Sequence, residues 1–162
     1  MWLTATVLCL FLSACNQATP KVTPIEPTNE TASVIDGMLL DQYPGPKAQI
    51  HYAESPPEFF SDLPELFTTL LVPEQKRPVV AVFVQDMGKT SWEHPVGNWI
   101  DAKTAIYVAG SRKMGSMGAT LGSFSNTADA ENFIQKEGGE ILRYDQVTPE
   151  KLKQYSSAAH SH

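Results

Sequence analysis

Thiols and long apolar runs are both scarce in this chain. Only two cysteines occur, Cys9 and Cys15, and both lie near the N-terminus. The N-terminal apolar stretch, Val7 to Leu12, is far shorter than the ~20 residues that a membrane-spanning helix needs. The sequence therefore predicts a removable export signal here instead of a permanent membrane helix.

The end of this stretch predicts lipid attachment. Leu12-Ser13-Ala14-Cys15 resembles the lipobox of bacterial lipoproteins, in which a branched apolar residue and two small residues precede the cysteine that receives the lipid. Residues 1–14 are then the signal peptide, and Cys15 is the lipidated first residue of the mature chain. No Lys or Arg precedes the run, which departs from the usual basic start. A buried N-terminal strand is the alternative, but the run lacks a strand's alternation of apolar and polar residues.

Processing leaves a mature chain without a thiol, because Cys9 departs with the signal and Cys15 carries the lipid. A disulfide, a zinc–thiolate site and a cysteine nucleophile are therefore excluded. The 12 basic and 18 acidic residues all follow Cys15 and give a net charge of −6, so nucleic acid is not an expected partner. We expect a lipid-anchored protein that faces the periplasm, and Asn16 slightly favours the outer membrane.

Motifs of the common enzyme classes are absent as well. The sequence contains no P-loop, no nucleotide-type glycine fingerprint, no nucleophile elbow and no paired-histidine zinc motif. The carboxylates Asp36, Asp41, Asp62 and Asp86 lack any spacing that forces a pair into one site, so solvated faces and turn caps are expected for them. The sequence favours a binding protein over an enzyme.

The composition changes twice along the mature chain. Residues 15–32 are rich in Thr, Pro, Gln, Asn and Glu, which predicts a lipidated, flexible tether. Residues 149–162 predict a mobile tail, made of a short capped helix and polar residues that end in His160-Ser161-His162. The segment between them is long enough for one compact domain or two small ones.

The first half of this segment, residues 33–88, predicts three strands and a helix. The helix is expected to begin at a Ser55 cap and to be kinked at Pro64. Its apolar stripe comprises Phe59, Phe60, Leu63, Phe67, Leu70 and Leu71. The predicted strands are 35–40, 47–52 and 79–84.

The second half, residues 89–148, repeats this order of elements. A helix is predicted over 127–137, where Gly138-Gly139 ends it. The predicted strands are 105–108, 119–124 and 140–144. We therefore predict an α+β fold of two small duplicated strand-strand-helix-strand units. An ordinary single α+β sheet is the alternative.

Methionine is the most informative residue type. Four methionines follow Cys15, each with a glycine neighbour: Met38, Met87, Met114 and Met117. They lie at predicted strand ends and in loops, whereas a core methionine normally sits among Leu and Phe. A thioether is a soft, neutral ligand that selects copper(I) over zinc, magnesium or calcium. Ordinary packing is the alternative for each, most of all for Met114, which follows two basic residues on a predicted turn.

The histidines are weaker candidates. His51 lies in a predicted strand on the face opposite Ile50, where it is either a copper ligand or a surface residue. His94 and the two tail histidines could bind copper weakly, but a solvated loop and a solvated tail are the preferred explanation for them. Trp92 and Trp99 flank the His94 loop and either pack over it or shield a soft cation near Met87.

Several separated motifs resemble one known family. In chain order they are Asp36-Gly37-Met38, Gly45 to His51, Val84 to Gly88, Trp92, Trp99 and Gly115 to Gly118. Together they are similar to the NosL family of periplasmic copper lipoproteins, which are accessory proteins of nitrous oxide reductase. The resemblance covers nearly all of the mature domain.

The resemblance implies a metallochaperone that binds copper(I) and supplies it to the catalytic copper centre of nitrous oxide reductase. The implied partners are the reductase, an ABC-type membrane complex and the periplasmic subunit of that complex. The implied fold is a duplicated strand-strand-helix-strand unit related to organomercurial lyase. Cys15 matches the lipid site, Met38, Met87 and Met117 match the family's methionine positions, and Met114 has no firm counterpart.

This chain departs from the family pattern at two places. Many relatives carry a cysteine shortly before the Gly-Met pair, and some carry another in the long helix, whereas these regions here contain Ser33 and Ser61. Two other functions stay open beside the copper carrier. One is an enzyme of the organomercurial lyase type, although its chemistry needs thiolates. The other is a structural envelope lipoprotein that binds no metal.

Overall fold

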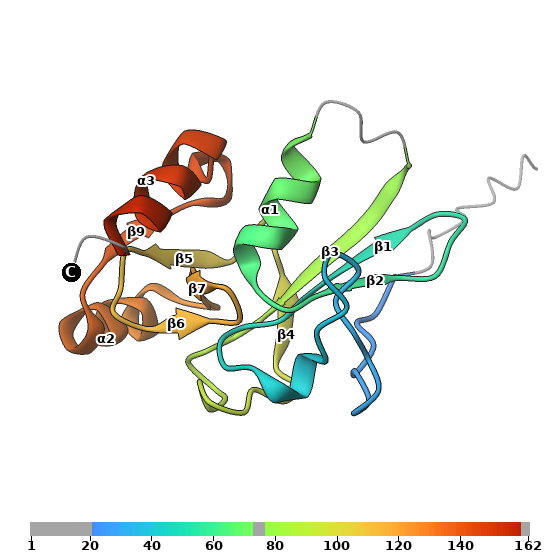
Figure 1. The fold of residues 1–162 in the computed structure, drawn as a ribbon, viewed down its shortest axis with the longest axis horizontal. Helices are drawn as coiled ribbons and strands as arrows, with labels where there is room; N and C mark the ends of the chain where they lie inside the picture. Colours follow the sequence, from blue (N-terminus) through green and yellow to red (C-terminus); the bar gives the residue numbers. More distant parts are fainter. Residues whose placement is uncertain (1–20, 73–76, 160–162) are drawn as a thin grey trace, which may run out of the picture.

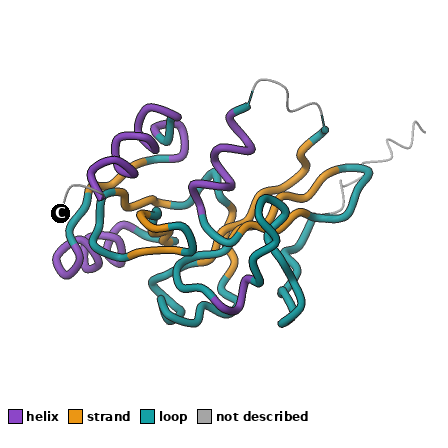
Figure 2. Tube along the Cα trace, in the orientation of Figure 1, coloured by secondary structure: helices purple, strands orange, loops and turns teal. Residues whose placement is uncertain are grey.

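The computed structural model describes residues 21–72 and 77–159. The predicted signal peptide and Cys15 lie outside the described residues, as do His160 and His162. Within the described ranges, no helix is long and apolar enough to cross a bilayer. Two units lie side by side in the fold, the first on the right and the second on the left of Figures 1 and 2.

The first unit is a four-stranded antiparallel sheet of order β2-β1-β3-β4. Its strands are β1 (Ala48–Tyr52), β2 (Glu58–Phe60), β3 (Val79–Gln85) and β4 (Trp99–Asp101). Helix α1 (Leu63–Leu71) covers one face of this sheet. Alternate residues of β1 point to opposite faces, so Ile50 packs under α1 while Gln49 and His51 face the other side.

The second unit is a three-stranded antiparallel sheet of order β8-β5-β9 with α2 (Thr127–Glu137) against it. Its strands are β5 (Ile106–Ala109), β8 (Gly122–Phe124) and β9 (Glu140–Leu142). A two-stranded hairpin of β6 (Met114–Gly115) and β7 (Gly118–Ala119) extends from this unit toward α1. In both units the first strand lies between the second and the third.

Three short or terminal elements complete the fold. They are η1 (Leu40–Gln42), η2 (Tyr144–Gln146) and α3 (Pro149–Ala159). The predicted tail therefore contains an eleven-residue helix, and its Leu152 and Tyr155 pack against the main hydrophobic core. The same core joins the units, because Phe67 of α1 meets Tyr107 of β5 edge-on with ring centroids 5.2 Å apart.

Most predicted elements of regular periodicity are present. The strands predicted over 47–52, 79–84 and 105–108 correspond to β1, β3 and β5, and the helix over 127–137 is α2. The strand predicted over 140–144 ends earlier, at Leu142. The strand predicted over 119–124 is divided into parts of β7 and β8.

The predicted start of the first helix is wrong. Glu58–Phe60 forms β2, because these residues pair with β1, and Ala48 lies opposite Phe60. The helix begins at Leu63 instead, and Asp62 is its cap, accepting a hydrogen bond from the Glu65 N–H at 3.2 Å. Pro64 then falls in the first turn, where a proline needs no N–H partner, so it does not kink α1.

The strand predicted over 35–40 is also wrong. Residues 34–36 form a turn, which Gly37 closes with a positive φ of 76°. Ala32 forms an isolated antiparallel bridge with Leu39 instead of joining a sheet. The Ser33 N–H donates to the Met38 carbonyl at 2.9 Å, so this loop folds back on itself beside the first turn of α1.

Candidate metal site

The first turn of α1 holds two carboxylates close together. Asp62 is the buried cap of the helix, and Glu65 follows it by three residues, which places both on the same turn. One oxygen of Glu65, Oε2, accepts three hydrogen bonds. The donors are the Ser33 hydroxyl at 3.0 Å and both the backbone N–H and the hydroxyl of Ser61 at 3.1 Å.

The β6–β7 hairpin is joined to the same cluster. The Ser116 hydroxyl donates to Asp62 Oδ2 at 3.1 Å and lies 2.7 Å from the Ser61 hydroxyl. The Met117 N–H also donates to the Asp62 carboxylate. Met117 therefore comes from the second unit of the fold, but its backbone is bound to an acid of the first.

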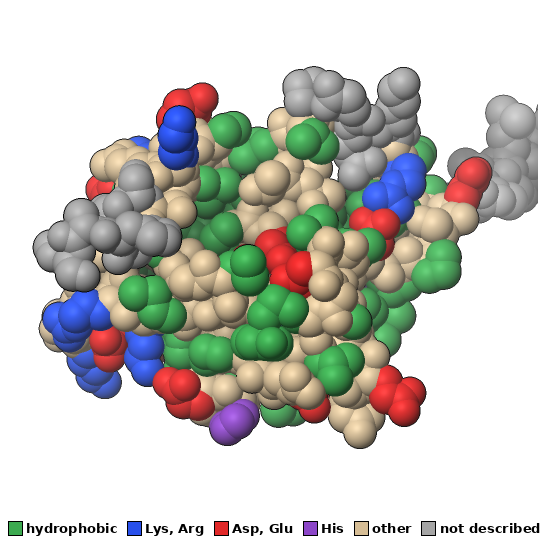
Figure 3. All heavy atoms as spheres, in the orientation of Figure 1, with side chains coloured by type: hydrophobic (Ala, Val, Ile, Leu, Met, Phe, Trp, Pro, Cys, Tyr) green, Lys and Arg blue, Asp and Glu red, His purple; other side chains and the backbone are tan. Residues whose placement is uncertain are grey.

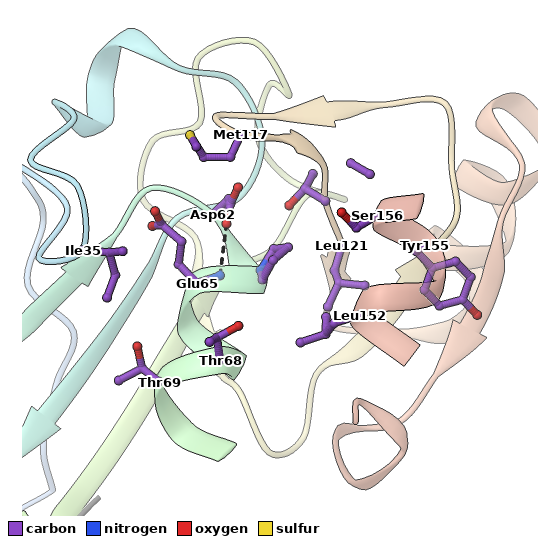
Figure 4. Close-up of a pocket in the computed structure, with 13 residues that line it drawn as sticks. Ile35, Asp62, Glu65, Thr68, Thr69, Met117, Leu121, Leu152, Tyr155 and Ser156 are labelled. Carbon is purple, nitrogen blue, oxygen red and sulfur yellow. Dashed lines mark hydrogen bonds between the residues drawn. The ribbon is translucent and has the colours of Figure 1, made fainter. Parts of the chain in front are cut away.

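These residues lie at the edge of an open cavity of about 360 Å³ between α1, α3 and the hairpin. Figure 4 shows Met117, Asp62 and Glu65 together on one side of it, with Leu121, Leu152 and Tyr155 on the other. Met117 is 67% exposed, so this residue is accessible from solvent. Figure 3 shows acidic side chains near the centre of this face with hydrophobic side chains around them.

Burial makes this cluster electrostatically unusual. It raises the pKa of Asp62, and it raises the pKa of Glu65 together with the nearby Asp62 charge. Lys47 is buried behind Ser61, and its ammonium donates to the carbonyls of Tyr43, Pro44 and Ser61 at 2.8, 3.0 and 3.1 Å. Burial lowers the pKa of Lys47 to about 8. Two carboxylates thus share one buried cation, and a bound cation would reduce their mutual repulsion.

The donor set is not that of a common structural metal site. Across residues 21–72 and 77–159, no three His, Cys, Asp or Glu side chains gather as a metal site. Met117 adds a soft thioether to the hard oxygens of Asp62 and Glu65. A cation that accepts a thioether ligand fits this arrangement better than magnesium or calcium, which prefer oxygen alone.

Met38 is the second predicted ligand that the structure brings near the cluster. Its carbonyl accepts from the N–H of Ser33, whose hydroxyl binds Glu65. Its side chain is half-buried in the loop that precedes η1. The Met38 backbone is thus joined to Glu65 through Ser33, whereas the Met117 backbone N–H binds Asp62 directly.

The other three predicted ligands lie elsewhere. Met87 is buried in the core of the second unit with Ile106 and Phe124. Met114 is exposed on β6, and its carbonyl accepts from the Trp92 indole N–H at 2.9 Å. His51 is buried on the face of β1 opposite α1, where its Nε2 lies 2.7 Å from Gln49 Oε1 and its ring contacts Phe83 edge-on.

The acid pair was not predicted from the sequence. Asp62 was expected on a solvated face or as a turn cap, and Glu65 was not a candidate, because the predicted helix start lies several residues too early. With the helix starting at Leu63, the motif Asp62-x-x-Glu65 is a recognisable cap that brings both carboxylates to the first turn. The buried Lys47 carried no signal in the sequence.

Fold and site together define a small α+β binding protein with an acidic, methionine-bearing cleft between two units. The sequence profile of the NosL family matches residues 24–152, and the chain belongs to this family. It is 40% identical to the copper-binding lipoprotein NosL of Achromobacter cycloclastes, over 90% of this chain and 78% of that protein. Identity to the copper-binding lipoprotein NosL of Stutzerimonas stutzeri is 32%, over 98% and 85% of the two chains.

A solved structure is similar as well. The crystal structure of the copper chaperone NosL from Shewanella denitrificans matches with a TM-score of 0.74 at 34% sequence identity. The match covers 82% of this chain and 99% of that one. The α+β architecture described above is therefore that of a NosL protein.

Proposed function

We propose that this chain is a lipid-anchored copper(I)-binding metallochaperone with no catalytic turnover of its own. One observation carries the proposal: the exposed Met117 lies beside the buried carboxylate of Asp62 and the half-buried carboxylate of Glu65, at the rim of an open cavity. A soft donor beside excess negative charge suits a soft monovalent cation. The names of the relatives, copper-binding lipoprotein and copper chaperone, agree with this cargo.

The position of Ser33 and Ser61 supports the same site. The family resemblance places cysteines of other members near these two positions, and here both hydroxyls bind one oxygen of Glu65. Thiolates at these positions would meet at the same point as the acid pair and Met117. A site without them holds copper through weaker ligands, which suits a protein that must release its cargo.

The wider role follows from the resemblance. We propose that the copper is destined for the catalytic copper centre of nitrous oxide reductase, and that the partners are the reductase, an ABC-type complex and its periplasmic subunit. We also propose that Cys15 carries the lipid and that the domain faces the periplasm. The shared strand order of the two units supports a duplication. A relation to organomercurial lyase stays a prediction, as does the preference for the outer membrane.

A copper(I) competition titration tests this function. The purified, metal-free mature chain is titrated against a coloured copper(I) chelator under reducing, oxygen-free conditions. We expect one copper(I) per chain and no competition by zinc or magnesium. A protein that removes no copper from the chelator would instead be the structural envelope lipoprotein, and carbon–mercury cleavage by the same preparation would favour the enzyme.

A further inference from the structure

The segment that the sequence predicts as a flexible tether is partly bound to the fold. Residues 21–29, here called the strap, lie along the outer face of the first sheet, opposite α1. The buried amide of Gln49 holds Ile25 at both backbone groups: Oε1 accepts from the Ile25 N–H at 2.8 Å, and Nε2 donates to the Ile25 carbonyl at 3.0 Å. These two bonds resemble one rung of a β-ladder.

The next residue of the strap is held from the other side. One oxygen of the Glu26 carboxylate accepts from the Gly97 N–H at 2.9 Å, and the other accepts from the Trp99 indole N–H at 2.8 Å. Charge-assisted hydrogen bonds of this kind are stronger than neutral ones. Ile25 and Glu26 together take part in four hydrogen bonds, so the strap is a fixed part of the domain.

The strap also has a direction. Its first residues lie beside Val80, Ala81 and Asp101, and its last residues lie beside Lys47 and Val96. It therefore runs along the sheet from the start of β3 toward its end at Gln85, a strand length of about 20 Å.

The two ends of this sheet differ in character. At the end where the strap begins, α1 finishes and β3 starts, and four apolar side chains between 38% and 50% exposed are found there: Leu71, Val72, Val79 and Val80. At the opposite end, Ala48 lies across from Phe60 and Val84, and Asp62 lies two residues after the end of β2. The acid pair and the start of the strap are thus at opposite ends of the sheet.

We propose that the apolar end of the first sheet rests on the lipid bilayer and that the strap holds the Asp62–Met117 end away from it. This interaction surface rests on the proposed lipid at Cys15. Six residue steps separate Cys15 from Lys21, which span at most about 20 Å when fully extended. A lipid attached so close to the start of the strap keeps Val79 and Val80 near the bilayer, and the copper cleft faces proteins arriving from the periplasm.

Spin labels on the full lipidated chain test this orientation. The mature chain offers no competing thiol, so Val80→Cys and Val72→Cys report the apolar end, and Val96→Cys reports the opposite end at a valine that is also exposed. Each labelled protein is placed on vesicles of phosphatidylethanolamine and phosphatidylglycerol. The accessibility of each label to lipid-soluble oxygen and to a water-soluble nickel complex is then compared.

We expect a several-fold higher oxygen-to-nickel ratio at residues 72 and 80 than at residue 96. Adding Glu26→Ala should reduce this difference, whereas Glu30→Ala, just after the strap, should leave it unchanged. Equal ratios at all three positions, or no effect of Glu26→Ala, would overturn the proposal. Flotation with vesicles reports the lipid anchor separately, and protein that fails to float contradicts both. Copper binding in solution is independent of these readouts, so it can fail without affecting them.

Discussion

Ser33 and Ser61 donate hydrogen bonds to the same atom, Oε2 of Glu65, at 3.0 and 3.1 Å. The two serines come from separate loops, one before the first sheet and one after β2. Their convergence defines a single point at which a soft ligand at either position would stand beside the acid pair.

Introducing a thiol at this point should tighten copper binding. For Ser33→Cys and Ser61→Cys we expect the copper(I) dissociation constant to fall on the order of tenfold or more, because a thiolate binds copper(I) more strongly than a thioether. The affinity should also become more dependent on pH, since the thiol proton must leave. Competition titrations at two pH values measure both effects. Ser55→Cys, at an exposed loop position, is the control, and an equal gain there would contradict the geometry.

The acid pair predicts how copper affinity depends on pH. Burial raises the pKa of both Asp62 and Glu65, so these groups take up protons at a higher pH than exposed carboxyls, whose pKa is about 4. As pH falls toward that range, copper affinity should decline earlier than for a surface site.

The metal-free protein should show the opposite trend in stability. A raised carboxyl pKa means that the folded state favours the protonated acid, so this contribution is present at low pH and is lost as pH rises through the folded pKa. Urea unfolding of the wild type and of Glu65→Gln, from the pH at which exposed carboxyls titrate upward, measures this contribution. Glu65→Gln should lose part of the pH dependence of both copper affinity and unfolding free energy. If both pH dependences are unchanged in the variant, Glu65 does not titrate in this range.

Lys47 should be required for stability. Replacing it in Lys47→Met removes the donor to two carbonyls in the turn before β1 and to the Ser61 carbonyl after β2, and should lower the free energy of unfolding by about 1–3 kcal/mol. Lys103→Met, at an exposed turn, should have little effect. Because the pKa of Lys47 is lowered from 10.5 to about 8, the wild type should gain stability relative to Lys47→Met between these pH values. Urea unfolding midpoints of the wild type and Lys47→Met at pH 7 and above pH 9 test both effects. Equal midpoints at pH 7, or a difference that does not grow above pH 9, would contradict the prediction.

Substitutions of Met87 distinguish a role in core packing from a role in metal binding. It is 8% exposed among apolar side chains, so Met87→Ala should cost about 2–4 kcal/mol of unfolding free energy, and Met87→Leu less than about 1.5 kcal/mol. We expect Met87→Leu to bind copper(I) as the wild type does. If its affinity drops while its fold is intact by circular dichroism, Met87 is a ligand after all.

The sequence predicts the elements that local apolar periodicity determines better than those that tertiary contacts determine. Periodic apolar residues correctly located β1, β3, β5 and α2, because burial on one face imposes the pattern. The stretch around Phe59 and Phe60 fits a helix stripe and a strand equally well, and its pairing with β1, a tertiary interaction, decided the outcome. Because the stretch was assigned to the helix, the predicted helix began too early, and the position of Asp62 and Glu65 on one turn was not recognised.

Of the candidate site, the sequence pointed only to methionines, because methionine beside glycine in a loop is not a core pattern, and copper binding by Met38 and Met117 stays a prediction. The approach of the Met117 hairpin to the acid pair depends on Ser116, which binds Ser61 and Asp62 across more than 50 positions of sequence. No local pattern encodes such a contact. The surface alternative for His51 is wrong for a similar reason, since residues 21–29 cover a strand face that the sequence left open to solvent.

The most direct measurement of the copper site compares two methionines of one hairpin. Met114 and Met117 are both well exposed, but only Met117 lines the cavity beside Asp62. In a copper(I) competition titration, Met117→Ala should raise the dissociation constant about tenfold or more, while Met114→Ala should change it by less than about twofold. Equal affinities for the wild type and both variants would contradict the account, because copper would then bind without the thioether that defines the site.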